Sequence, residues 1–310
     1  MGVKMNKAVV TGANGFVGSH VCKELADSNT KVYAVIKDEN ENIDSIKDLQ
    51  GISIVYCDLD NIESLSEKIT DNDIDVFYHF AWVGSAGNLR CDENIQLKNA
   101  LWTAQALRTA DKMGCKKFVN AGSIMEKETY TAVYTQGSTP GLPYIYGAGK
   151  LIAHAICKPI ANSLNIDLCW AVITNAYGAG EFSPRFVNTT IRKIIAGEPL
   201  QFTAATQNYD FIYIDDVAKA FVAIGEYGKA NKEYTIGSGN ARPLKEFIIE
   251  MQQSLAPDAK PIFGDVPFTG VNMPLEAFDT TDIQNDCHFK PSISFAEGTK
   301  MTMDWIKTVN

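Results

Sequence analysis

A tyrosine and a lysine four positions apart, Tyr146 and Lys150, carry the clearest chemistry in this sequence. In a helix, residues at i and i+4 lie on one face, so the phenol and the ammonium would be neighbours. An adjacent ammonium stabilises a phenolate and lowers the pKa of the tyrosine from about 10 toward the neutral range, as a general acid or base requires. We therefore predict that Tyr146 and Lys150 are the proton-handling pair of an active site.

The same spacing occurs a second time, from Tyr33 to Lys37. These residues fall in and just after the apolar segment 31–36, which is typical of a strand. Along a strand, residues four apart are separated by about 13 Å, too far for the two groups to interact. We therefore reject this second match as a catalytic pair.

A glycine-rich segment, T-G-A-N-G-F-V-G, occupies residues 11–18, between a strand predicted at 7–11 and a helix predicted at 19–27. Gly12 permits a tight turn, Gly15 lets backbone N–H groups approach a pyrophosphate, and Gly18 lets helix and strand pack closely. The helix N-terminus adds partial positive charge for the phosphates. The predicted dinucleotide-binding loop comprises Gly12, Asn14, Gly15, Phe16, Val17 and Gly18.

Predicted strands and helices alternate through the first half of the chain. Strands are expected at 31–36, 52–56, 74–80, 116–121 and 166–173, and helices at 61–70, 93–113 and 146–163. This alternation implies an α/β fold with a doubly wound parallel sheet of the Rossmann type. Residues 122–143 contain Gly, Ser, Thr and Pro and are predicted to be an active-site loop.

Beyond residue 175 the pattern is mixed. Short helices are predicted near 185–196, 215–227 and 243–255, and strands at 211–214 and 233–236. We expect a dinucleotide-binding domain of residues 1–174 and a smaller mixed α/β substrate lobe of residues 175–310. The two are expected to be interleaved, with some segments crossing back.

With these elements in place, the sequence resembles the extended branch of the short-chain dehydrogenases and reductases, which carries T-G-x-x-G-x-x-G at this point. In V-N-A-G-S, just past the fifth strand, Ser123 matches a family serine or threonine. The resemblance implies that Ser123 hydrogen-bonds the substrate carbonyl or hydroxyl and forms a catalytic triad with Tyr146 and Lys150. Asn99 matches a family asparagine involved in helix geometry and the proton path, and a solvated helix residue is the alternative.

Three later segments resemble nucleotide-sugar epimerases, dehydratases and reductases. They are N-A-Y-G-A-G at 175–180, D-F-I-Y-I-D-D-V-A at 210–218 and F-K-P-S-I-S-F-A-E-G at 289–298. The resemblance implies a nucleoside-diphosphate sugar as substrate, contacted by Ser123, Tyr146, Asn175 and Arg185. Val172 and Tyr209 stand where relatives carry arginines, so the candidates for gripping the diphosphate are Arg185, Arg192, Arg242 and Arg90.

The end of the second predicted strand indicates which nicotinamide cofactor is bound. NAD enzymes place an acid at its end to bind the ribose 2′-hydroxyl, but here Ile36 is followed by Lys37. A lysine suits a 2′-phosphate, which favours NADP (NADPH). Asp38 and Glu39 lie just beyond, so NAD is the alternative.

The resemblance adds further cofactor contacts. It implies that Asp58 and Leu59 touch the adenine ring. It also implies that the loop 79–82, with Phe80 and Ala81, runs beside the pyrophosphate and the nicotinamide ribose. Tyr146 and Lys150 complete the expected cofactor set.

The residues after Ser123 separate the enzyme classes. Related 4,6-dehydratases carry Thr-Asp-Glu here, whereas this chain reads Ser-Ile-Met-Glu, which disfavours dehydration. We expect an NAD(P)H-dependent oxidoreductase, in first place a 4-keto-6-deoxy-sugar 4-reductase with the tyrosine as proton donor. The alternatives are an NAD-dependent nucleotide-sugar 4-epimerase and, from another class, a non-catalytic NADP-binding redox sensor.

Composition limits which binding partners and which cellular compartment we expect for this protein. The net charge of −9, without a basic cluster, argues against nucleic acid. No run approaches the roughly 18 apolar residues of a membrane helix, and no metal site is expected. Seven scattered cysteines without C-x-x-C predict free thiols in the cytoplasm. The resemblance implies a homodimer in which 93–113 and 146–163 form a four-helix bundle.

Overall fold

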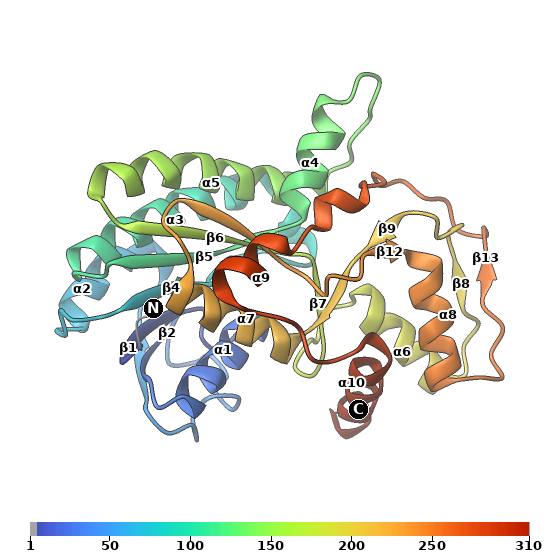
Figure 1. Ribbon diagram of the computed structural model, residues 1–310, viewed down its shortest axis with the longest axis horizontal. Coiled ribbons are helices and arrows are strands. Elements are labelled where there is room, and N and C mark those ends of the chain that lie inside the picture. The colour runs from blue at the N-terminus through green and yellow to red at the C-terminus, as the bar shows by residue number, and fades with distance from the viewer. Residues whose placement is uncertain (1–4, 310) are drawn as a thin grey trace.

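A seven-stranded parallel sheet lies at the centre of the computed structural model, which describes residues 5–309 (Figure 1). The strand order is β3-β2-β1-β4-β5-β6-β11. The bounds are β1 Lys7–Thr11, β2 Lys31–Ile36, β3 Ile52–Tyr56, β4 Val76–His79, β5 Lys117–Ser123, β6 Asp167–Ile173 and β11 Lys232–Ile236. The order reverses between β1 and β4, and ligands bind beyond the carboxyl ends of strands at such a point. The predicted Rossmann-type fold is confirmed.

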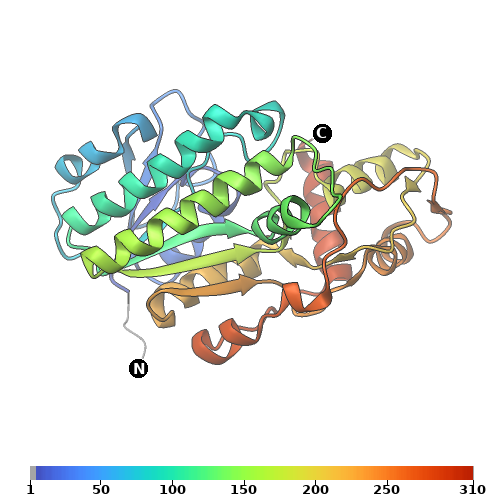
Figure 2. The ribbon, with the colours of Figure 1, turned by 90° about the horizontal axis from the view of Figure 1, so that it is seen from above.

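Helices cover both faces of this sheet. α3 (Glu93–Lys112) and α5 (Tyr144–Leu164) lie side by side on one face, and α1 (Phe16–Asp27) and α7 (Ile214–Tyr227) pack together on the other (Figures 1 and 2). Successive side chains of a strand point to opposite faces of the sheet. Phe77 therefore packs in the core on one face and Tyr78 in the core on the other. Among residues 5–309, no helix combines the length and apolar character needed to cross a bilayer.

The second lobe, at the right of Figure 1, is built from short strands and helices around an aromatic cluster that includes Tyr177, Phe211 and Phe295. Its elements are β7 Asn175–Tyr177, α6 Phe186–Ala196, β8 Gln201–Phe202, β9 Asn208–Tyr209, β10 Phe211–Tyr213, β12 Arg242–Pro243, α8 Leu244–Leu255, β13 Ile262–Phe263, η3 Leu275–Phe278 and α10 Phe295–Val309. Between them α7 and β11 return to the main sheet, and α9 (Thr281–Cys287) packs on α7. The division at residue 174 stays a prediction.

The segment 122–143 departs from the predicted loop. Its first part is a helix, α4 (Met125–Tyr134), and the rest connects α4 to α5. The helix is stabilised by packing against α5, with Thr129 and Ala132 buried, so tertiary contacts override the Gly- and Pro-rich composition. The helix predicted at 61–70 is also divided, into a 3₁₀ segment η1 (Leu59–Ser64) and a single turn α2 (Leu65–Lys68).

Candidate active site

The glycine-rich segment forms the turn between β1 and α1. Gly12 has φ +65°, and a Cβ there would lie 2.8 Å from the backbone nitrogen of Ala81. A Cβ on Gly18 would lie 2.1 Å from the carbonyl oxygen of Gly12. Gly15 caps the N-terminus of α1. The six loop residues named above line a cleft of about 330 Å³, and its close-packed backbone at a helix N-terminus fits a diphosphate.

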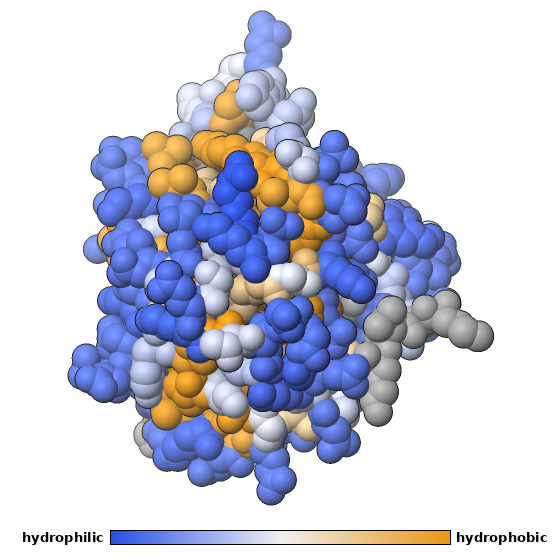
Figure 3. Space-filling view, turned by 90° about the vertical axis from the view of Figure 1, so that its left-hand side faces the viewer, coloured by the Kyte–Doolittle hydropathy of each residue, from blue (hydrophilic) through white to orange (hydrophobic). Residues whose placement is uncertain are grey.

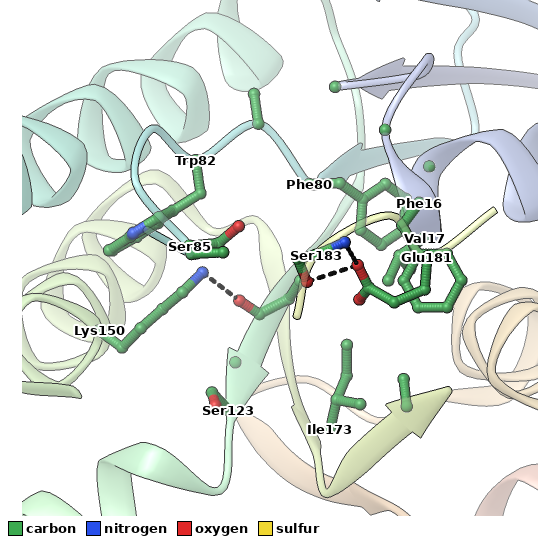
Figure 4. A pocket seen from close by; sticks show the side chains of 18 of the residues that line it. Phe16, Val17, Phe80, Trp82, Ser85, Ser123, Lys150, Ile173, Glu181 and Ser183 are labelled. Carbon is green, nitrogen blue, oxygen red and sulfur yellow. Dashed lines mark hydrogen bonds between the residues drawn. The ribbon is translucent and has the colours of Figure 1, made fainter. Parts of the chain in front are cut away.

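Tyr146 and Lys150 lie one turn apart on α5 and line the same cleft. The Lys150 ammonium donates a hydrogen bond to the carbonyl oxygen of Ala121 at 2.8 Å. It also lies 3.6 Å from the centre of the Trp82 ring, a cation–π contact (Figure 4). Lys150 is 5% exposed, and burial lowers its pKa to about 7, against the opposing charge of Glu126.

The rejected pair is separated in the structure. The Tyr33 hydroxyl donates to Asp71 at 2.5 Å, whereas Lys37 lines a pocket beside Asp58. The strand geometry that excluded this pair is therefore confirmed.

Ser123 ends β5 and lines the cleft with Tyr146. Its hydroxyl oxygen accepts the backbone N–H of Met125 at 3.2 Å. The three residues of the expected triad thus meet at the carboxyl end of the sheet, where a carbonyl group could contact Ser123 and Tyr146 together.

The expected effect of the lysine on the tyrosine is wrong for this structure. The Tyr146 pKa is raised, because burial of the phenol outweighs every charge near it. The charges that oppose the rise are guanidinium groups, first Arg90 and then Arg185. The Arg90 guanidinium lies 4.2 Å from the centre of the Tyr146 ring. The phenol therefore keeps its proton at neutral pH.

A loop that follows β4 separates the two ends of the cleft. Phe80, Ala81 and Trp82 line the cleft, as the cofactor prediction requires of the first two. Asn99 is buried rather than solvated: its amide donates to the Val83 carbonyl at 2.8 Å and its oxygen accepts the Val83 N–H at 2.9 Å. Asn99 therefore holds the loop against α3.

A second pocket, of about 360 Å³, continues from the glycine turn past the end of β2. Lys37, Asp58 and Leu59 line it, and their contact with the cofactor stays a prediction. Glu41, which sequence reasoning missed, lines it too, and Asn14 donates to this carboxylate at 3.5 Å. The pocket combines apolar and charged side chains and is large enough for a planar ring system beside the glycine turn.

The opposite end of the cleft leads into a pocket of about 200 Å³ lined by Asn175, Tyr209 and Arg185. Arg185 lines the main cleft as well, is about half exposed, and pairs with Glu181 at 3.0 Å. Arg90, the fourth candidate, reaches the tyrosine. These two arginines are the ones that the fold brings to the site.

The other two candidate arginines line neither pocket. Arg242 is paired with Glu250 and stacks 4.1 Å from the centre of the Phe247 ring. The Nε of Arg192 donates to Asn188 at 3.2 Å. Both are held by neighbouring side chains of the second lobe.

Sequence reasoning also missed the carboxylates of α4. Glu126 is buried behind Ser123, and Glu128 lies near Arg90, where burial raises its pKa to about 7 and the guanidinium opposes the rise. The signal for Glu126 was its position three residues after Ser123, which is the N-terminal turn of a helix only if α4 exists.

Comparison with known proteins identifies the family. The model of the NAD dependent epimerase/dehydratase family matches residues 8–237. CDP-abequose synthase of Salmonella typhimurium is 27% identical, with 82% of this chain and 83% of that protein aligned. The dTDP-4-dehydro-6-deoxyglucose reductase of Escherichia coli is 26% identical, covering 88% of this chain and 89% of the relative.

Solved structures agree on the fold. A UDP-N-acetylglucosamine 4-epimerase from Methanobrevibacter ruminantium, determined with UDP-N-acetylmuramic acid, superposes with a TM-score of 0.81 at 20% identity, covering 99% of both chains. The family match covers both the glycine turn and the Tyr146–Lys150 helix. This chain belongs to the NAD dependent epimerase/dehydratase family, whose relatives here are enzymes of nucleotide-sugar metabolism.

Proposed function

We propose that this protein is an NADPH-dependent reductase that converts the keto group of a nucleotide-linked 4-keto-6-deoxy sugar to a hydroxyl. The observation that carries the proposal is the meeting of Ser123, Tyr146 and Lys150 beside the glycine turn, with the phenol protonated at neutral pH. A reduction begins with a protonated donor, whereas an oxidation begins with a base. A relative that is by name a 4-dehydro-6-deoxyglucose reductase supports this choice.

In this reaction the bound nicotinamide supplies the hydride. Ser123 hydrogen-bonds the carbonyl oxygen, and Tyr146 donates its phenolic proton to that oxygen as the alcohol forms. The phenolate left on Tyr146 is stabilised by the guanidinium of Arg90 across its ring.

Dehydration is disfavoured by the residues next to Ser123. Ile124 is buried in a small apolar cluster with Met273 and Phe278, and Met125 follows it. No carboxylate stands at either position, so the acid pair that water elimination would use at this spacing is absent.

For the cofactor, we propose NADPH held by the glycine turn and by lysines at the ribose 2′ end. Lys37 and Lys68 line a depression of about 430 Å³ next to Asp58. Lys68 donates to the Tyr56 carbonyl at 2.6 Å, which fixes its ammonium at this edge. These two ammonium groups could pair with a 2′-phosphate, while Asp38, Glu39 and Asp58 line the same depression and could accept hydrogen bonds from a free 2′-hydroxyl.

For the substrate, we propose that the nucleoside diphosphate lies along Asn175 and Arg185 and that the sugar extends to Ser123 and Tyr146. Arg185 reaches both the main cleft and the smaller pocket, so it stands where a diphosphate would join the two. Its guanidinium suits phosphate oxygens through paired N–H donors.

The direct test is a panel of nucleotide-linked 4-keto sugars offered with NADPH or NADH and followed by nicotinamide absorbance. The proposal expects NADPH oxidation with at least one sugar, and loss of it in Tyr146→Phe. Binding of NADPH without oxidation by any member of the panel would contradict the proposal and favour the non-catalytic redox sensor.

One observation favours a second candidate, an NAD-dependent 4-epimerase. Glu41 lines the same pocket as Lys37, and an acid at this end can accept hydrogen bonds from a ribose diol. An epimerase regenerates its cofactor in each cycle and retains it. Stoichiometric NAD released by denaturing the purified protein would support the epimerase, whereas a cofactor-free protein that binds NADPH would support the reductase.

We also propose a homodimer formed through α3 and α5. Leu97 and Leu101 on α3 are 53% and 56% exposed, and Ile152 and Ile156 on α5 share the same i, i+4 spacing. In Figure 3, hydrophobic side chains gather below the projecting end of the molecule and are ringed by hydrophilic ones. Light scattering should give twice the chain mass, and Leu101→Glu should give a monomer.

The cytoplasm stays the predicted compartment. All seven cysteines are free thiols in the structure, which is usual for proteins of a reducing compartment. Fractionation of the cells that make this protein would test the prediction.

A further inference from the structure

Glu126 lies directly behind Ser123, where neighbouring residues hold its carboxylate in place. Its carboxylate accepts the backbone N–H of Ser123 at 2.8 Å. Both of its oxygens also accept the indole N–H of Trp170, each at 3.1 Å. Glu126 is 3% exposed, so this is a buried carboxyl group held by two donors from β5 and β6.

A histidine closes the outer side of this carboxylate. His154 Nδ1 lies 3.6 Å from a Glu126 oxygen, and the imidazole stacks on the Trp170 indole with ring centres 4.3 Å apart and planes 3° apart. The surrounding packing is tight. A Cβ on Gly122 would lie 2.5 Å from the indole nitrogen and 2.8 Å from a carboxylate oxygen. The glycine before the catalytic serine therefore makes room for this group.

The same cluster faces the proton-handling residues. Tyr146, Lys150 and His154 follow one another at intervals of four along α5, so they lie on one helix face. Glu126, from α4, holds the Ser123 N–H, and the Lys150 ammonium holds the Ala121 carbonyl two residues earlier on β5, so both groups are fixed to the same end of one strand. The Glu126 charge raises the pKa of Lys150 and of Tyr146. His79, from β4, is buried; burial and the Lys150 charge lower its pKa to about 3, so it is uncharged at neutral pH.

A buried carboxylate costs several kcal/mol unless its charge is used or compensated. We propose that Glu126 is a positioning residue for the reaction at Tyr146: it anchors Ser123 through its backbone and supplies the negative charge opposite the Lys150 ammonium, with His154 closing its outer side. The inference rests on the proposed role of Ser123, Tyr146 and Lys150.

The direction of the expected pH shift follows from how the Glu126 charge acts on Lys150 and on Tyr146. The Glu126 charge raises the pKa of Lys150 against burial, and it raises the pKa of Tyr146 as well. A reduction uses the protonated phenol and the charged lysine, so activity falls as pH rises through these values. Removing the charge lowers both pKa values and moves the alkaline fall to lower pH.

The decisive variant is Glu126→Gln, which keeps the size of the side chain and removes its charge. We expect the alkaline limb of kcat/KM to move down by roughly one pH unit, so that activity falls about tenfold at the alkaline side and changes little on the acid plateau. A purely structural role would lower activity by the same factor at every pH, and that result would overturn the proposal.

Two matched variants separate the roles of the carboxylate. Trp170→Phe keeps the stacked ring and removes one hydrogen bond without changing charge, so its alkaline limb should coincide with wild type. Glu126→Asp keeps the charge but shortens the reach to Ser123, so kcat should fall at all pH values with the limb unmoved. A shifted limb in either variant would contradict the assignment of the shift to charge.

A measurement without substrate distinguishes failure of this inference from failure of the proposed function. Lysine labelled with ¹³C at Cε reports the titration of Lys150 by NMR in the cofactor-free protein, with Lys150→Met to assign the signal. Glu126→Gln should lower the Lys150 pKa, and Glu126→Asp should leave it unchanged and serves if the glutamine variant does not fold. An unchanged Lys150 pKa in Glu126→Gln would overturn the inference, whatever sugars the protein reduces.

Discussion

At the glycine turn the wall of the cleft is close-packed backbone, whereas the pocket at the opposite end is lined by side chains from separate segments. The turn at residues 12–18 leaves no space for a Cβ at Gly12 or Gly18, so its shape depends on the absence of side chains. At the other end, Asn175 comes from β7, Arg185 from the residue before α6 and Tyr209 from β9. Proteins that share a fold share its backbone geometry, whereas side chains can be substituted one at a time. Cofactor binding at one end and substrate binding at the other can therefore change independently.

The residues between these ends belong to neither. Tyr146 and Lys150 sit on one helix: Lys150 contacts Trp82 in the loop after β4, and Tyr146 contacts Arg90. The comparison therefore predicts three separable kinds of variant: those that change turnover, those that change cofactor binding and those that change substrate binding.

The largest effect is expected where the two ends meet. Tyr146→Phe removes the proton donor while keeping the ring under Arg90, so kcat should fall at least about 10²-fold. Fluorescence titration with NADPH should show an unchanged Kd. A variant that retained turnover would remove Tyr146 from the chemistry.

At the cofactor end, Gly18→Ala places a methyl group 2.1 Å from the Gly12 carbonyl oxygen. Because backbone cannot move aside cheaply, we expect cofactor affinity to fall by roughly 10²-fold and Tm to drop. Gly141→Ala is the matched control, since its Cβ would meet only Pro143 at 3.6 Å. Equal losses in the two variants would show that the close contact is not what matters.

At the substrate end, Arg185→Ala should raise KM for the nucleotide sugar by roughly 10- to 100-fold, the range for a charged hydrogen bond. The Kd for NADPH should stay the same, because we assign Arg185, which also lines the smaller pocket, to the substrate. Arg108→Ala, an exposed arginine of α3, serves as the control. A loss of cofactor affinity in Arg185→Ala would break the separation of the two ends.

The smallest effect concerns cofactor choice. Lys37→Ala should lower the preference for NADPH over NADH by roughly twofold to fivefold, as expected for a solvent-facing ion pair with a phosphate. The ratio of kcat/KM for the two cofactors measures it at fixed ionic strength. A ratio that did not change would place the 2′ group elsewhere and would favour the role of Glu41.

The difference between the two ends also explains what could be predicted from the sequence. The bounds of β1, β2 and β3 match the predicted strands because apolar runs bounded by turns report burial in a parallel sheet. The glycine turn follows from local spacing alone. Arg90 is brought to the site by its contact with Tyr146, which is far away in the chain, and no local pattern reports that contact.

Two predictions from the sequence were wrong for the same reason. Residues 122–143 were expected to be a loop, but α4 forms because α5 packs against it, and Glu126 and Glu128 come to the site with that helix. The lysine was expected to lower the pKa of its tyrosine, but burial, which spacing does not reveal, raises the Tyr146 pKa and lowers that of Lys150. Both depend on tertiary contacts.

The central claim is that hydride and proton are added to a sugar ketone at this triad, with net consumption of NADPH. The most direct test uses NADPH carrying deuterium at the transferable position, with mass spectrometry and NMR of the sugar product. The account predicts one deuterium at C4 of the sugar for each NADPH oxidised, and none in Tyr146→Phe beyond its residual rate. Interconversion of C4 epimers with no deuterium incorporated and no NADPH consumed would contradict it.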